Sequence, residues 1–134
     1  MNLRILTMAV LVLLGVPASA HHSISAIYDS SRPLTLAGVI TGFAFVHPHP
    51  FITLEVRDGK SAPEVWRLEM DNRFELEGIG VTATTFKAGD RIVVTGSSGR
   101  AQALMLYVRK LERPADGFQY EQAGSSPRIS GPAR

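Results

Sequence analysis

The four histidines of this 134-residue chain form two close pairs, and their type and spacing could support chemistry. His21 and His22 follow the small-residue stretch "PASA", whereas His47 and His49 stand in "FVHPHPF". Neutral imidazole is a good ligand for copper, zinc, nickel and iron. The two pairs together predict a transition-metal site with His21, His22, His47 and His49 as candidate ligands and copper as the first candidate ion.

The segment before His21 resembles a bacterial secretory signal peptide. Arg4 provides a basic flank, an apolar run extends from Ile5 to Val16, and Ala18 and Ala20 provide the small residues of a cleavage site. The apolar run is shorter than the roughly 20 residues that a membrane-spanning helix needs. We therefore predict cleavage after Ala20, export to the periplasm or beyond, and no stable membrane span afterwards.

Cleavage at this point would give His21 a free α-amine. The amine and Nδ1 of the same residue can bind one ion together, and a third nitrogen would complete a T-shaped site that favours copper. His49 is the predicted third ligand, while His22 and His47 are predicted as substitutes or close neighbours. The alternative is a polar chain end without a metal, since terminal residues are usually mobile.

The connector around His47 and His49 is predicted to be stiff. Pro48 and Pro50 fix their own φ angles and restrict the residue before each to extended backbone. Two residues that are two positions apart in an extended chain can point the same way, which favours a shared ligand. A rigid loop whose histidines bond only to the backbone is the alternative that the sequence leaves open.

Alternating apolar and polar residues, separated by turn residues, predict an all-β domain with one short helix. The predicted strands are Leu34–Val46, Phe51–Arg57, Glu64–Met70, Arg91–Thr95 and Ala101–Leu111. Asn72 stands three residues before Glu75, the spacing of a helix capping box, and Gly78 can end that helix, which Phe74 and Leu76 would pack against the core. This order predicts a small five-stranded OB-fold-like Greek-key barrel, and an open β-sandwich of about seven strands is the alternative.

The predicted organisation has four parts. They are a signal peptide (1–20), an N-terminal extended segment (21–33), the OB-like domain (34–112) and a flexible, disordered tail (113–134) rich in Pro, Gly, Ser and charge. The absence of cysteine excludes disulfides and thiolate metal sites. The formal net charge is +2, one unit lower after loss of Arg4, with no basic stripe; together with export, this predicts that nucleic acid is not a partner.

No arrangement of residues matches an enzyme signature, so we predict a binding protein. Ser23, Ser97 and Ser98 lack the context of a nucleophile elbow. The alternative function is a metal-free interaction module that binds a periplasmic protein or an envelope component through the barrel face. Phe43, Phe45 and Phe51 would then be candidates for the contact surface.

Several segments together resemble a family of small exported bacterial proteins, domain of unknown function 6152. These are "HHS", "YD", "GVITGFAFVHPHPFITLEV", "WRLEM" and "FKAGDRIVVTG", between His21 and about Leu111. The connector of that family is Asn-Pro-His, so His47 stands where asparagine is usual and His49 is the position that carries over. This chain also has "GIG" where the family tends to have Gly-Trp. The resemblance implies export and no established activity.

Overall fold

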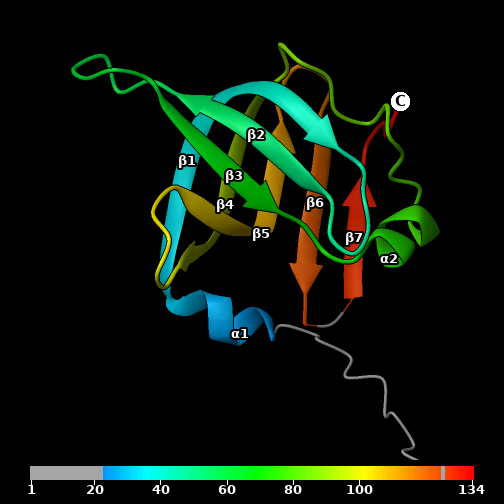
Figure 1. Cartoon of the computed structure of the whole chain (residues 1–134). Coiled ribbons are helices and arrows are strands. Elements are labelled where there is room, and N and C mark those ends of the chain that lie inside the picture. Colours follow the sequence, from blue (N-terminus) through cyan, green and yellow to red (C-terminus); the bar gives the residue numbers. More distant parts are fainter. Residues whose placement is uncertain (1–22, 125) are drawn as a thin grey trace, which may run out of the picture.

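The computed structural model describes residues 23–124 and 126–134, which fold around a single seven-stranded sheet (Figure 1). The strands are β1 (Tyr28–Ala44), β2 (Phe51–Val56), β3 (Glu64–Glu69), β4 (Arg91–Gly99), β5 (Met105–Arg113), β6 (Phe118–Ala123) and β7 (Ser126–Ser130). Two short helices accompany them, α1 (Ile24–Ile27) and α2 (Arg73–Gly78). Within these residues, no helix is long and apolar enough to cross a bilayer.

The strands β1 to β5 close into a ring. The sheet order is β3-β2-β1-β4-β5-β6-β7, and β3 also pairs with β5 in parallel through Arg67–Glu69 and Met105–Tyr107. Every other strand pair is antiparallel. A ring of this order, with a helix between β3 and β4, is the OB arrangement. The predicted OB-like fold is therefore confirmed, and the sandwich alternative is wrong because one continuous sheet carries all the strands.

The first strand bends to serve both sides of the ring, as its glycines predicted. β1 pairs with β4 along residues 28–39 and with β2 along residues 39–44, with an irregularity in register between Ile40 and Gly42. A Cβ atom at Gly38 would overlap the backbone carbonyl oxygen of Glu55 in β2. Glycine at this position thus allows the two strands to approach closely enough for the bend.

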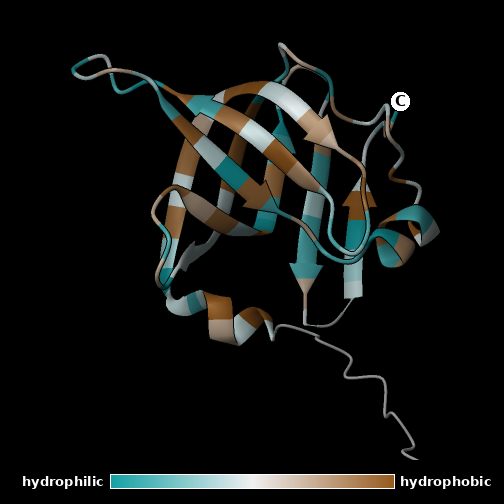
Figure 2. Ribbon diagram, in the orientation of Figure 1, coloured by the Kyte–Doolittle hydropathy of each residue, from teal (hydrophilic) through white to brown (hydrophobic). Residues whose placement is uncertain are grey.

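The core fills the ring with side chains from alternating positions of the strands, and Figure 2 shows this alternation of hydrophobic and hydrophilic residues. Ile52 and Leu54 of β2, Leu68 of β3 and Val94 of β4 are completely buried. Burying each such side chain contributes about 1.5–3 kcal/mol to folding. The same alternation that predicted these strands therefore also provides most of the driving force that closes them.

The C-terminal segment is ordered, so the prediction of a flexible tail from residue 113 is wrong. β6 pairs with β5, and β7 pairs with β6. Phe118 and Tyr120 of β6 are 0% and 1% exposed and belong to the hydrophobic core. The hairpin is ordered because its inward side chains complete that core, even though its composition is polar overall.

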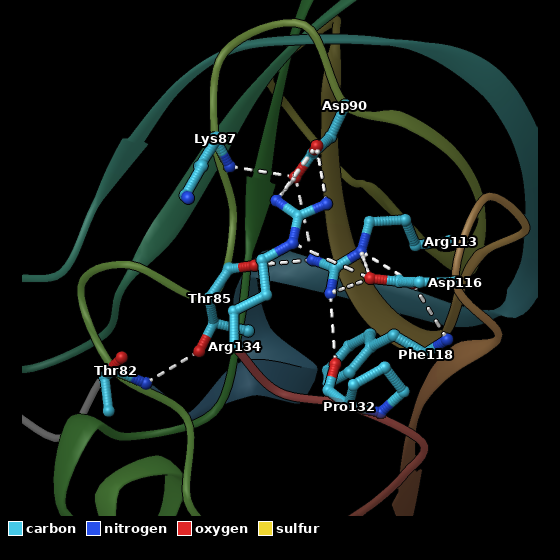
Figure 3. A network of polar contacts seen from close by, with 9 residues as sticks. All are labelled: Thr82, Thr85, Lys87, Asp90, Arg113, Asp116, Phe118, Pro132 and Arg134. Carbon is cyan, nitrogen blue, oxygen red and sulfur yellow. Dashed lines mark hydrogen bonds and ion pairs between the residues drawn. The ribbon is translucent and has the colours of Figure 1, made fainter.

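A buried arginine fastens the chain end to the ring (Figure 3). The guanidinium of Arg113 is completely buried and contacts the backbone oxygens of Thr85 and Pro132 and the carboxylates of Asp90 and Asp116. Arg134 pairs with the same two carboxylates, at 3.0 Å from Asp90 and 3.6 Å from Asp116. The hydrogen bond from Arg113 holds the pKa of Asp116 below its usual value. The charge of each arginine is thus compensated within the network.

The structure tests the predictions made for α2 and for residues 21–33. α2 begins at the predicted cap, since the Asn72 side chain accepts a hydrogen bond from the Glu75 backbone N–H at 3.0 Å. Leu76 is buried as predicted, but Phe74 is 71% exposed, because it lies on the outer side of the helix. The predicted extended segment 21–33 contains α1 in its described part, and β1 already starts at Tyr28.

Candidate metal site at the histidine connector

The connector between β1 and β2 lies along the junction between β3 and α2. The carbonyl oxygen of Pro50 accepts a hydrogen bond from the Met70 N–H at 2.9 Å, and that of Pro48 accepts one from the Arg73 N–H at 3.0 Å. Proline has no N–H, so the connector uses its carbonyl groups to bind the junction. Residues 47–50 are thereby held against residues 70–73.

His49 sits between these two hydrogen bonds and makes a third. Its Nδ1 lies 3.0 Å from the backbone oxygen of Met70, in a half-buried position. A carbonyl oxygen can only accept a hydrogen bond, so Nδ1 carries the proton in the neutral ring. The lone pair of the neutral imidazole is therefore on Nε2. The nearest carboxylate oxygen to Nδ1 is Glu69 Oε1, at 4.0 Å.

His47 contacts the helical end of the same junction. Its side chain is exposed, and its ring centroid lies 4.7 Å from that of Phe74, with the planes tilted by 48°. The two histidines of the connector therefore face one junction from neighbouring positions. His49 is held by a directional hydrogen bond, whereas His47 is held by ring contact alone.

Glu69 links the junction to the start of β1. The hydroxyl of Tyr28 donates a hydrogen bond of 2.6 Å to Glu69 Oε2. Tyr28 is 1% exposed, and its burial, followed by the hydrogen bond to Glu69, raises the pKa of its hydroxyl. The segment that follows the predicted cleavage site is thus anchored, through Tyr28, to the residue that borders His49.

Two further carboxyl groups meet at the start of α2. Asp71 Oδ1 accepts a hydrogen bond from the Asn72 backbone N–H at 2.7 Å, while Asp71 Oδ2 is buried and has no hydrogen-bond partner among the described residues. The neighbouring Asp71 carboxyl raises the pKa of Glu75. Burial, and then the charges of Asp71, Glu69 and Glu75, raise the pKa of Tyr107. We call the group formed by His49, Glu69, Asp71 and Glu75 the acidic corner.

The corner contains one of the predicted ligands and three residues that were not predicted. An aspartate between the end of a strand and a helix cap is the one signal that could have identified Asp71. His21 and His22 lie outside the described residues. Within residues 23–124 and 126–134, no three His, Asp or Glu side chains are already arranged to hold an ion.

The phenylalanines considered for an interaction surface are all partly buried. Phe43 and Phe45 pack against the core, and Phe43 makes an edge contact with Phe86 at 5.1 Å between centroids. Phe51 lies under the Arg67 guanidinium, which is 3.7 Å from its ring centroid. Phe43 and Phe45 stabilise the closed sheet by packing against its core, and Phe51 lies beneath a charged group. The area that these three side chains offer to a partner is therefore limited.

Comparison with known proteins identifies a family and a shared architecture. A family model described as "Family of unknown function (DUF6152)" matches residues 9–105. No curated protein matches the chain significantly. The mitochondrial single-stranded DNA-binding protein Rim1 of S. cerevisiae has a similar structure, with 11% identity, 60% of this chain and 91% of that chain covered, and a TM-score of 0.47.

Two other solved structures are similar to a comparable degree. The N-terminal domain of PriB from Thermoanaerobacter tencongensis shares 21% identity, covering 61% of this chain and 94% of that one, with a TM-score of 0.44. A ZRD-deleted mutant of TiaS in complex with agmatine shares 15% identity, covering 77% of this chain and 26% of that one, with a TM-score of 0.47. Similarity at this level describes the fold and assigns no ligand.

The sequence-based exclusion of nucleic acid as a partner needs correction. It was argued from net charge and export alone, whereas the similar structures include a protein named for binding single-stranded DNA. A small net charge describes the whole chain, whereas a binding surface depends on how charges are distributed over the fold. The exclusion is therefore withdrawn.

Proposed function

The chain belongs to the family of unknown function DUF6152, and from its own residues we propose that it is an exported protein that binds a transition-metal ion at the histidine connector. Copper is the first candidate ion, because nitrogen donors from imidazole and an α-amine favour it. Storage, delivery or sensing of the metal would each use such a site.

The hydrogen bond between His49 Nδ1 and the Met70 carbonyl oxygen supports this proposal most strongly. Histidines that bind metals almost always donate their other ring N–H to a carbonyl or carboxylate, which fixes the tautomer and the ring orientation. His49 has this arrangement before any ion is bound. Its Nε2 is then a preoriented donor, so less side-chain entropy is lost when the ion binds.

The mature N-terminus is proposed to supply the remaining nitrogen ligands. After cleavage behind Ala20, the His21 amine and imidazole could bind the ion together, with His22 and His47 as neighbours or substitutes. The anchor between Tyr28 and Glu69 supports this, because it holds the beginning of β1 beside the corner that contains His49. The α-amine has a pKa of about 7.7–8.0, so metal binding must displace a proton and should weaken in acid.

The test is a calorimetric titration of Cu(II) into three forms of the protein. The first starts at His21, the second carries one additional residue before His21, and the third is His49→Ala in the mature form. We expect binding at least about tenfold weaker in the second and third forms, which corresponds to about 1.4 kcal/mol. His47→Ala is the matched control and should change the affinity less, because His47 is exposed and lacks a fixing hydrogen bond.

Each outcome distinguishes the ligands. Equal affinity for Cu(II) with and without the additional residue would show that the α-amine is not a ligand. Equal affinity for Cu(II) in the mature protein and in His49→Ala would show that His49 is not a ligand. No binding of Cu(II) by the mature protein would refute the metal site and favour the metal-free interaction module.

A further inference from the structure

A cleft of about 390 Å³ lies between the first part of β1, Trp66 of β3 and the loop 100–104 that joins β4 to β5. Figure 1 shows this loop, in yellow, beside the first residues of β1. Most of the lining residues are apolar, namely Pro33, Leu34, Trp66, Ala103, Leu104 and Met105. Sites for small molecules usually have volumes of about 300–1,000 Å³, apolar walls and a few polar groups. The cleft therefore has the size and the lining of a site for a small organic molecule.

Trp66 forms one wall of the cleft, and its ring is held in place. Its indole Nε1 donates a hydrogen bond of 3.0 Å to the Glu64 carboxylate, and the partly buried side chain packs against the hydrophobic core. A hydrogen bond and core packing together restrict the rotation of the ring before a ligand is present. The ring can then contact a flat ligand with little further loss of side-chain entropy. Trp66 therefore favours a ligand with a flat aromatic body.

The loop that forms another wall is fastened on two sides. The carbonyl oxygen of Leu104 accepts a hydrogen bond from the Arg67 N–H at 2.9 Å, and the Arg100 N–H donates to the Ile27 carbonyl oxygen at 2.8 Å. Leu104 has a φ angle of 59°, in the left-handed region that bulky side chains rarely adopt. Such a conformation persists only where the surrounding contacts impose it, and it is found most often at binding and active sites. The cleft is thus formed before a ligand binds.

A bulge in β1 brings Arg32 to the cleft, and Arg32 is the one charged residue among the described residues that line it. Between Asp29 and Pro33, β1 advances four residues while its partner β4 advances one, so residues 30–32 are left out of the ladder. Bulges of this kind redirect a side chain. The Ser98 hydroxyl donates to the Arg32 carbonyl oxygen at 3.1 Å and fixes the backbone there. The Arg32 side chain is exposed, and its guanidinium has no ion pair or hydrogen bond with any residue that the structure describes.

We infer that this cleft binds a small organic anion with a flat apolar body and one acidic group, such as an aromatic carboxylate. The body contacts Trp66 and the apolar side chains, and the acidic group pairs with Arg32. A guanidinium matches the geometry of a carboxylate, with two parallel hydrogen bonds. No carboxylate lines the described part of the cleft, so no lining residue competes for the guanidinium. The inference is independent of the proposed metal site, because the cleft shares no residue with the histidine connector.

The test uses two fluorescent probes that share one aromatic body. Anilinonaphthalene sulfonate is an anion, whereas phenylnaphthylamine has no charge. Each probe is titrated into the wild-type protein, and binding is followed by the quenching of Trp66, the single tryptophan. We expect the anion to quench Trp66 and to bind at least about fivefold more tightly than the neutral probe, a ratio that corresponds to about 1 kcal/mol and is typical of a strong exposed ion pair.

Three variants locate the bound probe. Arg32→Gln should weaken binding of the anion about fivefold and leave binding of the neutral probe unchanged. Ala103→Phe should weaken binding of both probes, because the new ring occupies the cleft from an exposed position. Arg91→Gln is the matched control, since it removes an exposed arginine of β4 that does not line the cleft, and it should change either affinity by less than about twofold. A thermal melt of each variant checks that it is folded.

Each outcome decides for or against the site. Equal affinities of the two probes for the wild-type protein would refute an anion site, and this comparison needs no variant. Normal binding of the sulfonate by folded Arg32→Gln would refute the role of Arg32. Normal binding of both probes by folded Ala103→Phe, or binding without quenching of Trp66, would show that the probes bind elsewhere and would overturn the inference.

Discussion

Replacing Phe118 by alanine should destabilise the whole domain, even though Phe118 lies in the segment that composition assigns to a tail. The ring is 0% exposed, meets Phe86 edge to face at 5.5 Å between centroids, and has the Arg113 guanidinium 4.8 Å above it. Phe→Ala replacements at such sites cost about 3–5 kcal/mol, through lost burial and the cavity that remains. Since domains of this size are stable by about 5–15 kcal/mol, the loss would be a large fraction of the total.

The assay is equilibrium unfolding in urea, followed by the fluorescence of Trp66, the single tryptophan. Gln119→Ala is the control, because Gln119 is the exposed neighbour on the same strand and should change stability by less than about 0.5 kcal/mol. The variant Phe118→Ala should show a lower midpoint with an unchanged slope. A loss below about 1 kcal/mol would mean that β6 is not part of the cooperative unit, and the assignment of Phe118 to the core would be wrong.

Three other predictions follow from local geometry. Gly96→Ala should lower the free energy of unfolding, measured in urea, by about 1–3 kcal/mol, because its Cβ would overlap a carbonyl oxygen of β5. The control Gly78→Ala should leave this free energy unchanged, because a Cβ there would have no neighbour within 4 Å. Tyr28→Phe removes the hydrogen bond to the Glu69 carboxylate and should lower stability by about 1.5–3 kcal/mol; a thermal melt identical to that of the wild type would contradict this. The pKa of Asp116 is lowered from 3.8 in the folded state, so its stabilising effect is complete above that value and is lost as the pH falls further. The stability difference between wild type and Asp116→Asn should therefore shrink between about pH 5 and pH 2, and a difference that grows in acid would refute the pairing.

The parts of the fold that follow local rules could be predicted from the sequence. β2 and β3 alternate apolar and polar residues, and the side chain of Asn72 caps α2 as its spacing indicates. β6 was missed because Gly117 and Gly124 at its ends and the surrounding polar residues dominate the composition. Yet Phe118 and Tyr120 alternate with exposed residues there, so the period-two pattern was present over a short stretch.

The histidine connector was predictable, but the acidic corner was not. Pro48 and Pro50 show from the sequence alone that the connector is restricted. The burial of Asp71, by contrast, depends on which segment covers the β3–α2 junction, and that pairing joins residues 20 or more positions apart. Alternation along one strand carries no information about such contacts, so only the folded chain reveals Asp71 as a buried carboxyl with an unpaired oxygen among the described residues.

The sheet ends at β7, and its outer edge has a consequence for self-association. A free edge normally exposes a row of N–H and C=O groups that can accept a strand from another molecule, which is a common start of aggregation. β7 is short, and it contains Pro127, which has no N–H, followed by the charged Arg128. The edge therefore offers an interrupted set of donors, and intermolecular strand addition at this position is disfavoured.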